Sequence, residues 1–360
     1  MSGVHANLIS FEAPVRWTTY DPPKQAVVVN VANDRSVATT VKYATSNNIP
    51  FLAQNGGNGW ATTYNLSSNH KTRATIGGGS NINNTIARAS AAGALVTTGN
   101  CNCVCTLGAM LGGSYGNLLG VYGFGIDKIV SLQVVTADGR MRTVSATSEP
   151  DLFWRLRGAG PNLGIVTSAV VKSYLVQQNN LQAWAGSLVF TPDKLEQVVQ
   201  AVQEFQFKPT TVVFMYFVGG GPPFNEPIIH ITSLMYKSTP ETGRAAFDNF
   251  YNIGPMAEDT AVLPWTRWNT DSDAFCTPGA RNPSFGAGIQ KMSRNSAILL
   301  EAYSLAKAQS INANTAAFPH RNVKFNALII GWYEDKALDR LALSFGRATR
   351  DLLRASDGPR

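Results

Sequence analysis

The sequence predicts an α+β protein with two domains, and three features of its 360 residues support this fold class. A strand–helix–strand pattern covers residues 25–53, glycines crowd residues 107–125, and strand-like runs alternate with helices after Gln177. The length is sufficient for two hydrophobic cores. We therefore expect one domain over residues 1–177 and a second over residues 178–360.

The first domain is expected to begin with a β-α-β unit. Residues 25–31 form a β-branched, strand-like run, and Asp34 can cap a helix that ends near Asn48. Residues 49–53 then predict a second strand, followed by the Gly/Asn-rich turn 54–60, whose backbone N–H groups a ligand can approach closely. Beyond this turn the pattern predicts helices over residues 81–92 and 151–158, strands over residues 94–98 and 165–176, and a hairpin over residues 129–140.

The second domain is expected to be an antiparallel sheet with covering helices. Apolar runs typical of strands occupy residues 184–190, 211–218, 228–236, 297–303 and 324–332. Helical patterns occupy residues 192–205, 241–251 and 335–355.

The charge distribution excludes some partner classes. The chain carries a net charge of +7, of which residues 1–180 contribute +6 and residues 181–360 contribute +1. The basic residues are scattered singly, without runs or interleaved aromatics, so we do not expect nucleic-acid binding. No stretch approaches the roughly 20 apolar residues of a membrane span.

The start of the sequence shows no secretory signal. No basic start followed by an apolar block precedes Arg16. We therefore expect a cytoplasmic protein as the sequence stands, with a secretory origin open if the start has been trimmed. The oligomeric state also stays open.

Three of the four cysteines lie close together. Cys101, Cys103 and Cys105 alternate, and Cys276 is distant in the sequence. Zinc ligand pairs usually leave two to four residues between them, and near neighbours on one strand cannot bridge easily. We predict small buried hydrophobic side chains here and no metal site.

Several blocks of sequence carry a family resemblance. They are PFLAQNGGNG (50–59), ALVTTGNCNCVCTLGAMLGGSYGNLLGVYG (94–123) with Asp127, VVTADG (134–139), DLFWRLRGAGPNLGIVT (151–167) and FPHR (318–321). In this order they resemble flavoproteins of the vanillyl-alcohol-oxidase type, in the fungal berberine-bridge-enzyme-like branch. The resemblance implies the FAD-linked-oxidase (PCMH-type) fold, with an α/β flavin-type domain and a substrate domain that lays an antiparallel sheet over the flavin ring.

The resemblance also implies where FAD would be held, if it is bound. In this family two glycine-rich loops bring backbone amides to the pyrophosphate, and a histidine and a cysteine commonly attach the flavin. The matching positions are Asn55, Gly56, Gly57, Asn58, Gly59, Cys101, Gly112, Gly113 and Gly116.

The sequence departs from the family pattern at several positions. Asn58 stands where the family has the attaching histidine, and Cys105 and Ser114 replace loop glycines. The strand over residues 323–332 has no carboxylate, so the usual base is expected to be absent. The loop over 66–73 and the segment between Met292 and Ala297 are shortened, and the family's final return to the flavin domain is missing before Arg360. We therefore expect a degenerate flavin domain.

These departures favour a cofactor-independent enzyme. The chain resembles the flavin-free hetero-Diels–Alderases of tropolone–sesquiterpene biosynthesis in fungal secondary metabolism. Such a pericyclase dehydrates a hydroxymethyl tropolone to a quinone-methide-like diene and adds it to a humulene-type alkene. The reaction needs an apolar pocket that orders its reactants and a few polar groups that assist the loss of water.

Side chains on the second domain's strands supply the candidate site. The catalytic candidates are His230, Glu301 and Asn326, and the candidates that contact an apolar small-molecule substrate are Tyr216, Thr232, Tyr236, Trp265, Arg267, Tyr303 and Trp332. Glu301 stands out because a carboxylate in an apolar strand is rarely buried without a partner. Alternation places Tyr216 on one face of its strand, and His230 and Thr232 on one face of theirs. Packing in a core or sheet is the ordinary alternative for each aromatic residue.

Two other functions stay open. The first is an FAD-dependent oxidoreductase that oxidises an alcohol or secondary metabolite, as the retained Cys101 and the segment 157–164 favour. The second is a non-catalytic binding protein built on the same fold.

Overall fold

The computed structural model describes residues 9–12, 16–19, 26–54, 65–66, 72–219, 226–279 and 297–356. The chain divides into two compact units that both combine helices with antiparallel sheet, as the predicted α+β class requires. Unit 1 contains Met1–Val15, Pro23–Leu181 and Leu305–Asn322, and unit 2 contains Arg16–Pro22, Gln182–Ser304 and Val323–Arg360. The predicted boundary at Gln177 and this division differ mainly in Leu305–Asn322, which belongs to unit 1.

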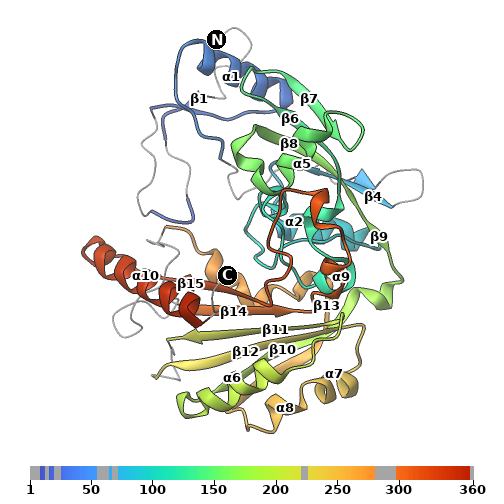
Figure 1. Cartoon of the computed structure of the whole chain (residues 1–360), viewed down its shortest axis with the longest axis vertical. Helices are drawn as coiled ribbons and strands as arrows, with labels where there is room; N and C mark the ends of the chain where they lie inside the picture. Colours follow the sequence, from blue (N-terminus) through green and yellow to red (C-terminus); the bar gives the residue numbers. More distant parts are fainter. Residues whose placement is uncertain are drawn as a thin grey trace. The chain divides into compact units, whose positions relative to one another are not determined.

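Unit 1 is built on a sheet of antiparallel pairs. Within the described residues its strands follow the order β3-β4-β8-β6-β7. Their bounds are β3 Asn65–Leu66, β4 Arg73–Gly77, β6 Ile129–Val135, β7 Met141–Ser145 and β8 Ile165–Lys172. The expected hairpin is confirmed as the pair β6–β7 (Figure 1). Two short pairs complete the unit: β1 (Ile9–Ser10) with β2 (Val28–Val29), and β5 (Ala94–Leu95) with β9 (Tyr174–Leu175).

The described helices of unit 1 are α1 Asp34–Ser46, α2 Ile82–Ala91, α3 Thr106–Leu111, α4 Leu119–Tyr122, α5 Pro150–Ala159 and α9 Ala306–Gln309. Three of them, α1, α2 and α3, begin where a capping side chain accepts a hydrogen bond from a free backbone N–H group. Asn33, not the expected Asp34, caps α1, because its side-chain oxygen accepts a 2.9 Å hydrogen bond from the Ser36 amide. Asn81 caps α2 in the same way.

The expected β-α-β unit at the start is wrong in its second strand. Residues 49–54 form no strand, and Phe51 and Leu52 are 48% and 66% exposed. The first strand is reduced to β2. A short apolar run alone is therefore not sufficient to predict a strand, because strand formation also needs a hydrogen-bonded partner.

Unit 2 is an antiparallel sheet with helices on one face. Among the described residues its strand order is β13-β10-β12-β11-β14-β15. The bounds are β10 Gln182–Phe190, β11 Thr211–Val218, β12 Ile228–Tyr236, β13 Ala257–Pro264, β14 Ala297–Tyr303 and β15 Phe325–Ile330. All five predicted strands are confirmed within two residues at each end. Strand β13 was not predicted.

Three helices cover one face of this sheet, as Figure 1 shows. They are α6 Leu195–Glu204, α7 Pro240–Ala246 and α8 Asp248–Tyr251, and α10 (Asp339–Ser356) follows β15. The buried core between sheet and helices includes Trp184, Leu188 and Met215 from the strands, and Phe247 and Phe250 from the helical segment. Burying such large apolar side chains contributes about 1.5–3 kcal/mol each. The side chains at the alternate positions of these strands point to the other face of the sheet.

Candidate functional site

The sheet face of unit 2 that points away from α6–α8 carries the polar candidates. The register pairs Tyr216 with His230, Phe214 with Thr232, and Phe214 with Glu301 across the strands. Glu301 pairs in turn with Asn326 of β15. Because side chains of paired residues lie on one face, these residues share the surface opposite the helix-covered core. The register thus adds Tyr216 to the face that alternation gives to His230 and Thr232.

A hydrogen-bonded group forms around the carboxyl of Glu301. Asn326 Nδ2 donates to Glu301 Oε2 over 3.0 Å, and the Tyr303 hydroxyl donates to the same oxygen over 3.2 Å. Among the described residues, none donates to Oε1. The strand over residues 323–332 indeed lacks a carboxylate, but the neighbouring strand supplies one at the position beside Asn326. A proton acceptor is therefore present on this face.

Burial controls the acidity of this carboxyl. It raises the pKa of Glu301 above the usual range, while the hydrogen bonds from Asn326 and Tyr303 act to lower it. At a given pH, a larger fraction of this carboxyl is therefore protonated and uncharged than of an exposed carboxyl. Such a group holds its proton to a higher pH than an exposed carboxyl does, and once ionised it is a stronger base.

Aromatic side chains surround the histidine of this face. The Tyr216 ring lies 5.7 Å from the His230 ring and stacks on Phe275 at 6.1 Å. The Tyr216 hydroxyl is 3.4 Å from Ser272 Oγ. Phe275 and Ser272 belong to the 3₁₀ segment Thr270–Cys276, which the sequence analysis missed because a short 3₁₀ turn has no clear periodicity. Alternation places Phe214 on the same strand face as Tyr216, although it was not among the candidates; its ring packs edge-on against Tyr303 at 5.6 Å.

The histidine should make folding stability depend on pH. Burial lowers the pKa of His230 to about 4, and its Nε2 is buried without a hydrogen-bond partner among the described residues. Between an unfolded-state pKa of about 6.5 and the folded value, the unfolded chain binds more protons. We expect the free energy of unfolding to fall as the pH drops through this window.

Urea unfolding at a series of pH values tests this expectation. His230→Gln should flatten the acid-side decline of the unfolding free energy. His320→Gln, at an exposed histidine, should keep it. An unchanged slope in His230→Gln would show that another group causes the decline.

Some of the remaining candidates lie on this face and others lie outside it. Thr232 is buried on it, and Tyr236 packs edge-on against Trp268 at 5.6 Å. Trp265 is buried in the 3₁₀ turn Trp265–Arg267, whereas Arg267 is exposed. Trp332 is buried after β15 and packs against Trp17 at 6.0 Å. Trp265, Arg267 and Trp332 thus lie outside the paired strand positions that bring the other candidates together.

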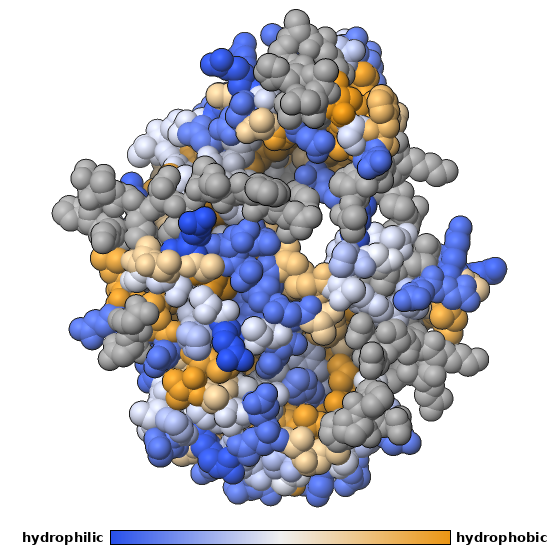
Figure 2. All heavy atoms as spheres, turned by 180° about the vertical axis from the view of Figure 1, so that it is seen from behind, coloured by the Kyte–Doolittle hydropathy of each residue, from blue (hydrophilic) through white to orange (hydrophobic). Residues whose placement is uncertain are grey.

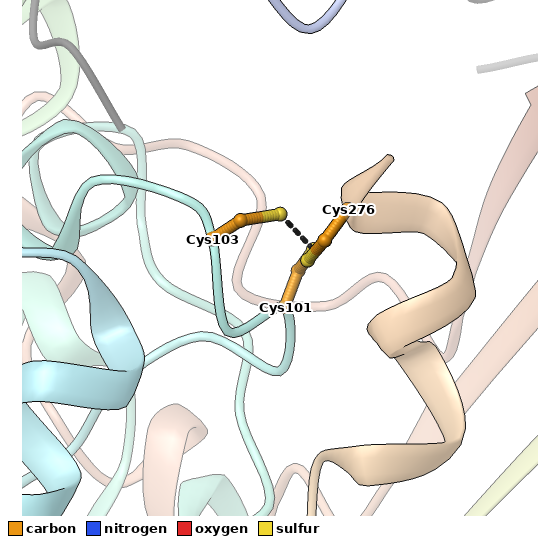
Figure 3. Close-up of side chains that lie close together, drawn as sticks. All are labelled: Cys101, Cys103 and Cys276. Atoms are coloured by element: carbon orange, nitrogen blue, oxygen red, sulfur yellow. Dashed lines mark hydrogen bonds between the residues drawn. The ribbon is translucent and has the colours of Figure 1, made fainter. Parts of the chain in front are cut away.

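The cysteine-rich loop of unit 1 differs from its prediction. Cys101, Cys103 and Cys105 are each half-buried in a turn before α3, not fully buried on a strand. The sulfur atoms of Cys101 and Cys103 lie 3.5 Å apart (Figure 3). Cys105 caps α3, since its sulfur accepts a 3.3 Å hydrogen bond from the Gly108 amide and lies 3.5 Å from the Gly78 carbonyl oxygen. Cys105, which replaces a loop glycine of the family, therefore caps the N-terminus of α3.

This chain is similar to known proteins both in sequence and in fold. A family model described as an FAD binding domain matches residues 63–145. The FAD-linked oxidoreductase OXR1 of Pyricularia oryzae is 30% identical over 95% of this chain and 76% of its own length. The chain belongs to the FAD-linked oxidoreductase family. The FAD-linked oxidoreductase azaL of Aspergillus niger is also similar, with 27% identity over 95% of this chain and 82% of its own length.

Solved structures show the same fold at low identity. Berberine-bridge-enzyme-like 1 of Physcomitrella patens superposes with a TM-score of 0.80 at 15% identity, covering 95% of this chain and 83% of that chain. The 6-hydroxy-D-nicotine oxidase of Arthrobacter nicotinovorans gives a TM-score of 0.74 at 19% identity, over 95% and 83% of the two chains. These likenesses confirm the predicted two-domain fold. The family relationship favours FAD-dependent oxidation, which the sequence analysis gave as the alternative, over cofactor-free cyclisation.

The described part of the family's second glycine loop fits a polar ligand. The hydroxyls of Thr97 and Ser114 are buried and have no hydrogen-bond partner among the described residues. Buried hydroxyls are normally paired, so two orphaned ones leave hydrogen-bonding capacity for a bound group. Outside this loop, Gly79 lies in the exposed turn after β4, where a Cβ would meet no atom within 4 Å. Residues 55–59, the first expected loop, lie outside the described residues.

Two neighbouring glycines of this loop should respond differently to substitution. Gly113 has φ +120°, and a methyl group there would lie 2.7 Å from the Phe318 ring. Gly113→Ala should therefore cost about 1–3 kcal/mol of folding free energy through overpacking, with backbone strain in addition. At Gly112 the nearest atom would be 3.7 Å away, so Gly112→Ala should cost less. Equal urea midpoints for the two variants would contradict this.

No described helix is both long enough and sufficiently apolar to cross a membrane. Figure 2 shows hydrophilic side chains interspersed with separate apolar groups on the face that it draws.

Proposed function

We propose that this protein is an FAD-dependent oxidoreductase that oxidises a hydroxyl-bearing, largely apolar small molecule, such as a secondary metabolite. Membership of the FAD-linked oxidoreductase family supports the cofactor. The carboxyl of Glu301, held by Tyr303 and Asn326 on the sheet face opposite α6–α8, is the observation that carries the proposal.

Glu301 is the proton acceptor in the proposed reaction. Oxidation of an alcohol to a carbonyl removes one proton from oxygen and one hydride from carbon. Glu301 Oε1 takes the hydroxyl proton, while Tyr303 and Asn326 hold Oε2 and fix the orientation of the carboxyl. Its raised pKa makes the ionised carboxylate a stronger base than an exposed glutamate.

The cofactor supplies the other half of the reaction. FAD, when bound, supplies an acceptor for the hydride. On the chain's side, the hydroxyls of Thr97 and Ser114 are the described groups that would hold it. Cys101 is the position at which the family resemblance implies covalent attachment.

The aromatic neighbours set the class of substrate. Tyr216, Phe275, Phe214 and Tyr303 flank the polar group with ring surfaces. Ring surfaces bind apolar or aromatic molecules, and the few polar groups among them fix orientation. His230 is neutral at pH 7, so it can donate or accept one hydrogen bond without adding a charge. A planar, oxygenated hydrocarbon skeleton is the substrate class that these groups favour.

A second candidate function is cofactor-independent cyclisation of such a molecule. It is favoured by side chains at two glycine positions of the loop, Cys105 and Ser114, the latter in the left-handed conformation at φ 61°. In that reaction a protonated Glu301 would donate its proton to a leaving hydroxyl. The polar sheet face would then promote dehydration, with no oxidant involved.

Oxygen consumption separates the two functions. Purified protein loaded with FAD should consume oxygen in the presence of a panel of aromatic and terpenoid alcohols, and the carbonyl product should form in equal amount. Product that forms without FAD and without oxygen, by loss of water alone, would contradict oxidation and support cyclisation.

A further inference from the structure

We infer that unit 1 carries a binding site for a small oxyanion, such as a phosphate group, formed by Lys128, Lys172 and Lys307. The site is additional to the proposed oxidation site on the sheet of unit 2. It gathers residues that are scattered in the sequence: Lys128 ends the 3₁₀ turn Gly125–Lys128, Lys172 ends β8, and Lys307 lies in α9.

Lys128 is the central group of this site. The residue is only 6% exposed as a whole, and no residue that the structure describes makes a hydrogen bond or ion pair with its amine. The amine is not among the fully buried polar atoms, so Nζ keeps access to solvent while the rest of the side chain is enclosed. A lysine held in this way presents its charge to an anion that is supplied from outside the chain.

The carboxylate of Asp127, next to Lys128, already pairs with an arginine. Asp127 receives two hydrogen bonds from Arg321, over 2.9 and 2.7 Å, and both side chains are almost completely buried. Arg321 Nε is buried and has no partner among the described residues. The acidic group that lies next to Lys128 among the described residues is thus held by another cation, and positive charge remains in excess there.

Lys128 and Lys307 approach each other at one glycine. A Cβ at Gly123, where φ is +86°, would lie 3.8 Å from Lys128 Nζ, 3.8 Å from Lys307 Cγ and 3.1 Å from Ile311 Cδ1. The two lysine side chains thus border the same glycine. A residue without a side chain is needed there, because Ile311 already lies close to the backbone.

The charges that act on Lys128 agree with an excess of cations. Burial lowers the pKa of Lys128 to about 8, Asp127 raises it, and Lys172, Lys307 and Arg321 lower it further. Lys172 and Lys307 are exposed and can fold over a ligand. Two basic residues from the first half of the sequence, Lys128 and Lys172, thus lie near Lys307 in the fold.

Inorganic phosphate serves as the probe. The midpoint of thermal unfolding is measured at pH 7 against phosphate concentration, with chloride holding the ionic strength constant. The variants are Lys128→Met, Lys307→Ala and, as the matched control, Lys336→Met at an exposed lysine of unit 2. Phosphate stabilises most proteins weakly by exclusion from their surface, and this background is common to all variants.

We expect a saturable rise of the midpoint in the natural protein and in Lys336→Met. Lys128→Met and Lys307→Ala should each need at least about tenfold more phosphate for the same rise, about 1.4 kcal/mol of binding free energy. The effect should weaken as the pH rises through 8, where Lys128 loses its charge. Lys307 is exposed, so Lys307→Ala keeps the test valid if Lys128→Met does not fold.

Two results would overturn the inference. The first is an equal phosphate response in Lys128→Met, Lys307→Ala and Lys336→Met. The second is loss of the response when FAD is added at saturation, which would assign these lysines to the flavin phosphates. A protein that binds no FAD but keeps the lysine-dependent response would refute the proposed oxidation and leave this site intact.

Discussion

Glu301→Gln should slow substrate oxidation by about 10²- to 10⁴-fold, the range that a general base contributes. Glutamine keeps the size of the side chain and can still accept hydrogen bonds from Tyr303 and Asn326, but it cannot take a proton. Because the substitution removes a buried carboxyl, the free energy of unfolding should not decrease. The rate of flavin reduction under anaerobic conditions measures the effect.

A matched control isolates the role of the carboxyl. Glu334 is an exposed glutamate after β15, so Glu334→Gln makes the same chemical change away from the sheet face. It should leave the rate unchanged. A Glu301→Gln rate within about threefold of the natural protein would show that another group takes the proton.

A companion variant tests whether the carboxyl titrates in the reaction. The hydrogen bond from Tyr303 lowers the pKa of Glu301, so Tyr303→Phe should raise it. The acid limb of the pH–rate profile should then move to higher pH, since the carboxylate is the active form. An unmoved limb in Tyr303→Phe would contradict the assignment of that limb to Glu301.

Asp127→Asn should destabilise unit 1 by about 3–5 kcal/mol, the cost of breaking a buried ion pair by removing one partner. The substitution leaves the Arg321 guanidinium buried without its carboxylate, between the rings of Phe124 and Phe318. It also removes the anion nearest to Lys128. Amide exchange in β6 under increasing urea reports the loss.

The paired replacement separates charge from packing. Asp127→Asn combined with Arg321→Met should recover a large part of the lost stability, because no uncompensated charge remains. Asp138→Asn is a control for charge alone, because that carboxylate is exposed and its ion pairs with Arg140 and Arg142 are worth little. Equal effects of Asp127→Asn and Asp138→Asn would contradict the importance of the buried pair.

The ion pair also fastens the segment Leu305–Asn322 within unit 1. Trp154 Nε1 donates to the Asn314 carbonyl over 2.7 Å, and the Arg157 guanidinium donates to the carbonyl of Thr315. The Tyr115 hydroxyl donates to the carbonyl of His320. The family motif at residues 318–321 is thus explained by local structure: Phe318 fills the space over Gly113, and Arg321 neutralises Asp127.

Five of the six described strands of unit 2 could be predicted because each is a long apolar run, whereas β13, with two acidic residues near its start, was missed. Alternation placed His230 and Thr232 on one face of their strand, and the register adds Tyr216 of the neighbouring strand to that face. Alternation could not join Glu301 to Asn326, because strand register depends on tertiary pairing between segments more than 20 residues apart. The strand of Asn326 lacks a carboxylate, and the neighbouring strand supplies one at Glu301.

Polar clusters were harder to predict than strands. Lys128, Lys172 and Lys307 are isolated basic residues in the sequence, and only the fold brings them together. The same holds for Phe275 over Tyr216, which comes from a short 3₁₀ segment without periodicity. Cys105 could be seen as a departure from the glycine pattern, but its role as the cap of α3 depends on backbone conformation. Contacts of this kind need three-dimensional coordinates.

The most direct test of FAD-dependent oxidation is an absorption spectrum of the purified protein from about 300 to 550 nm, before and after incubation with FAD and removal of the excess. We predict the two flavin bands at close to one equivalent per chain. Acid precipitation then shows whether the flavin is released or stays with the pellet, as attachment at Cys101 would require. A colourless protein that remains colourless after incubation with FAD would contradict the proposed oxidation and leave cofactor-independent cyclisation as the function that the Glu301 group serves.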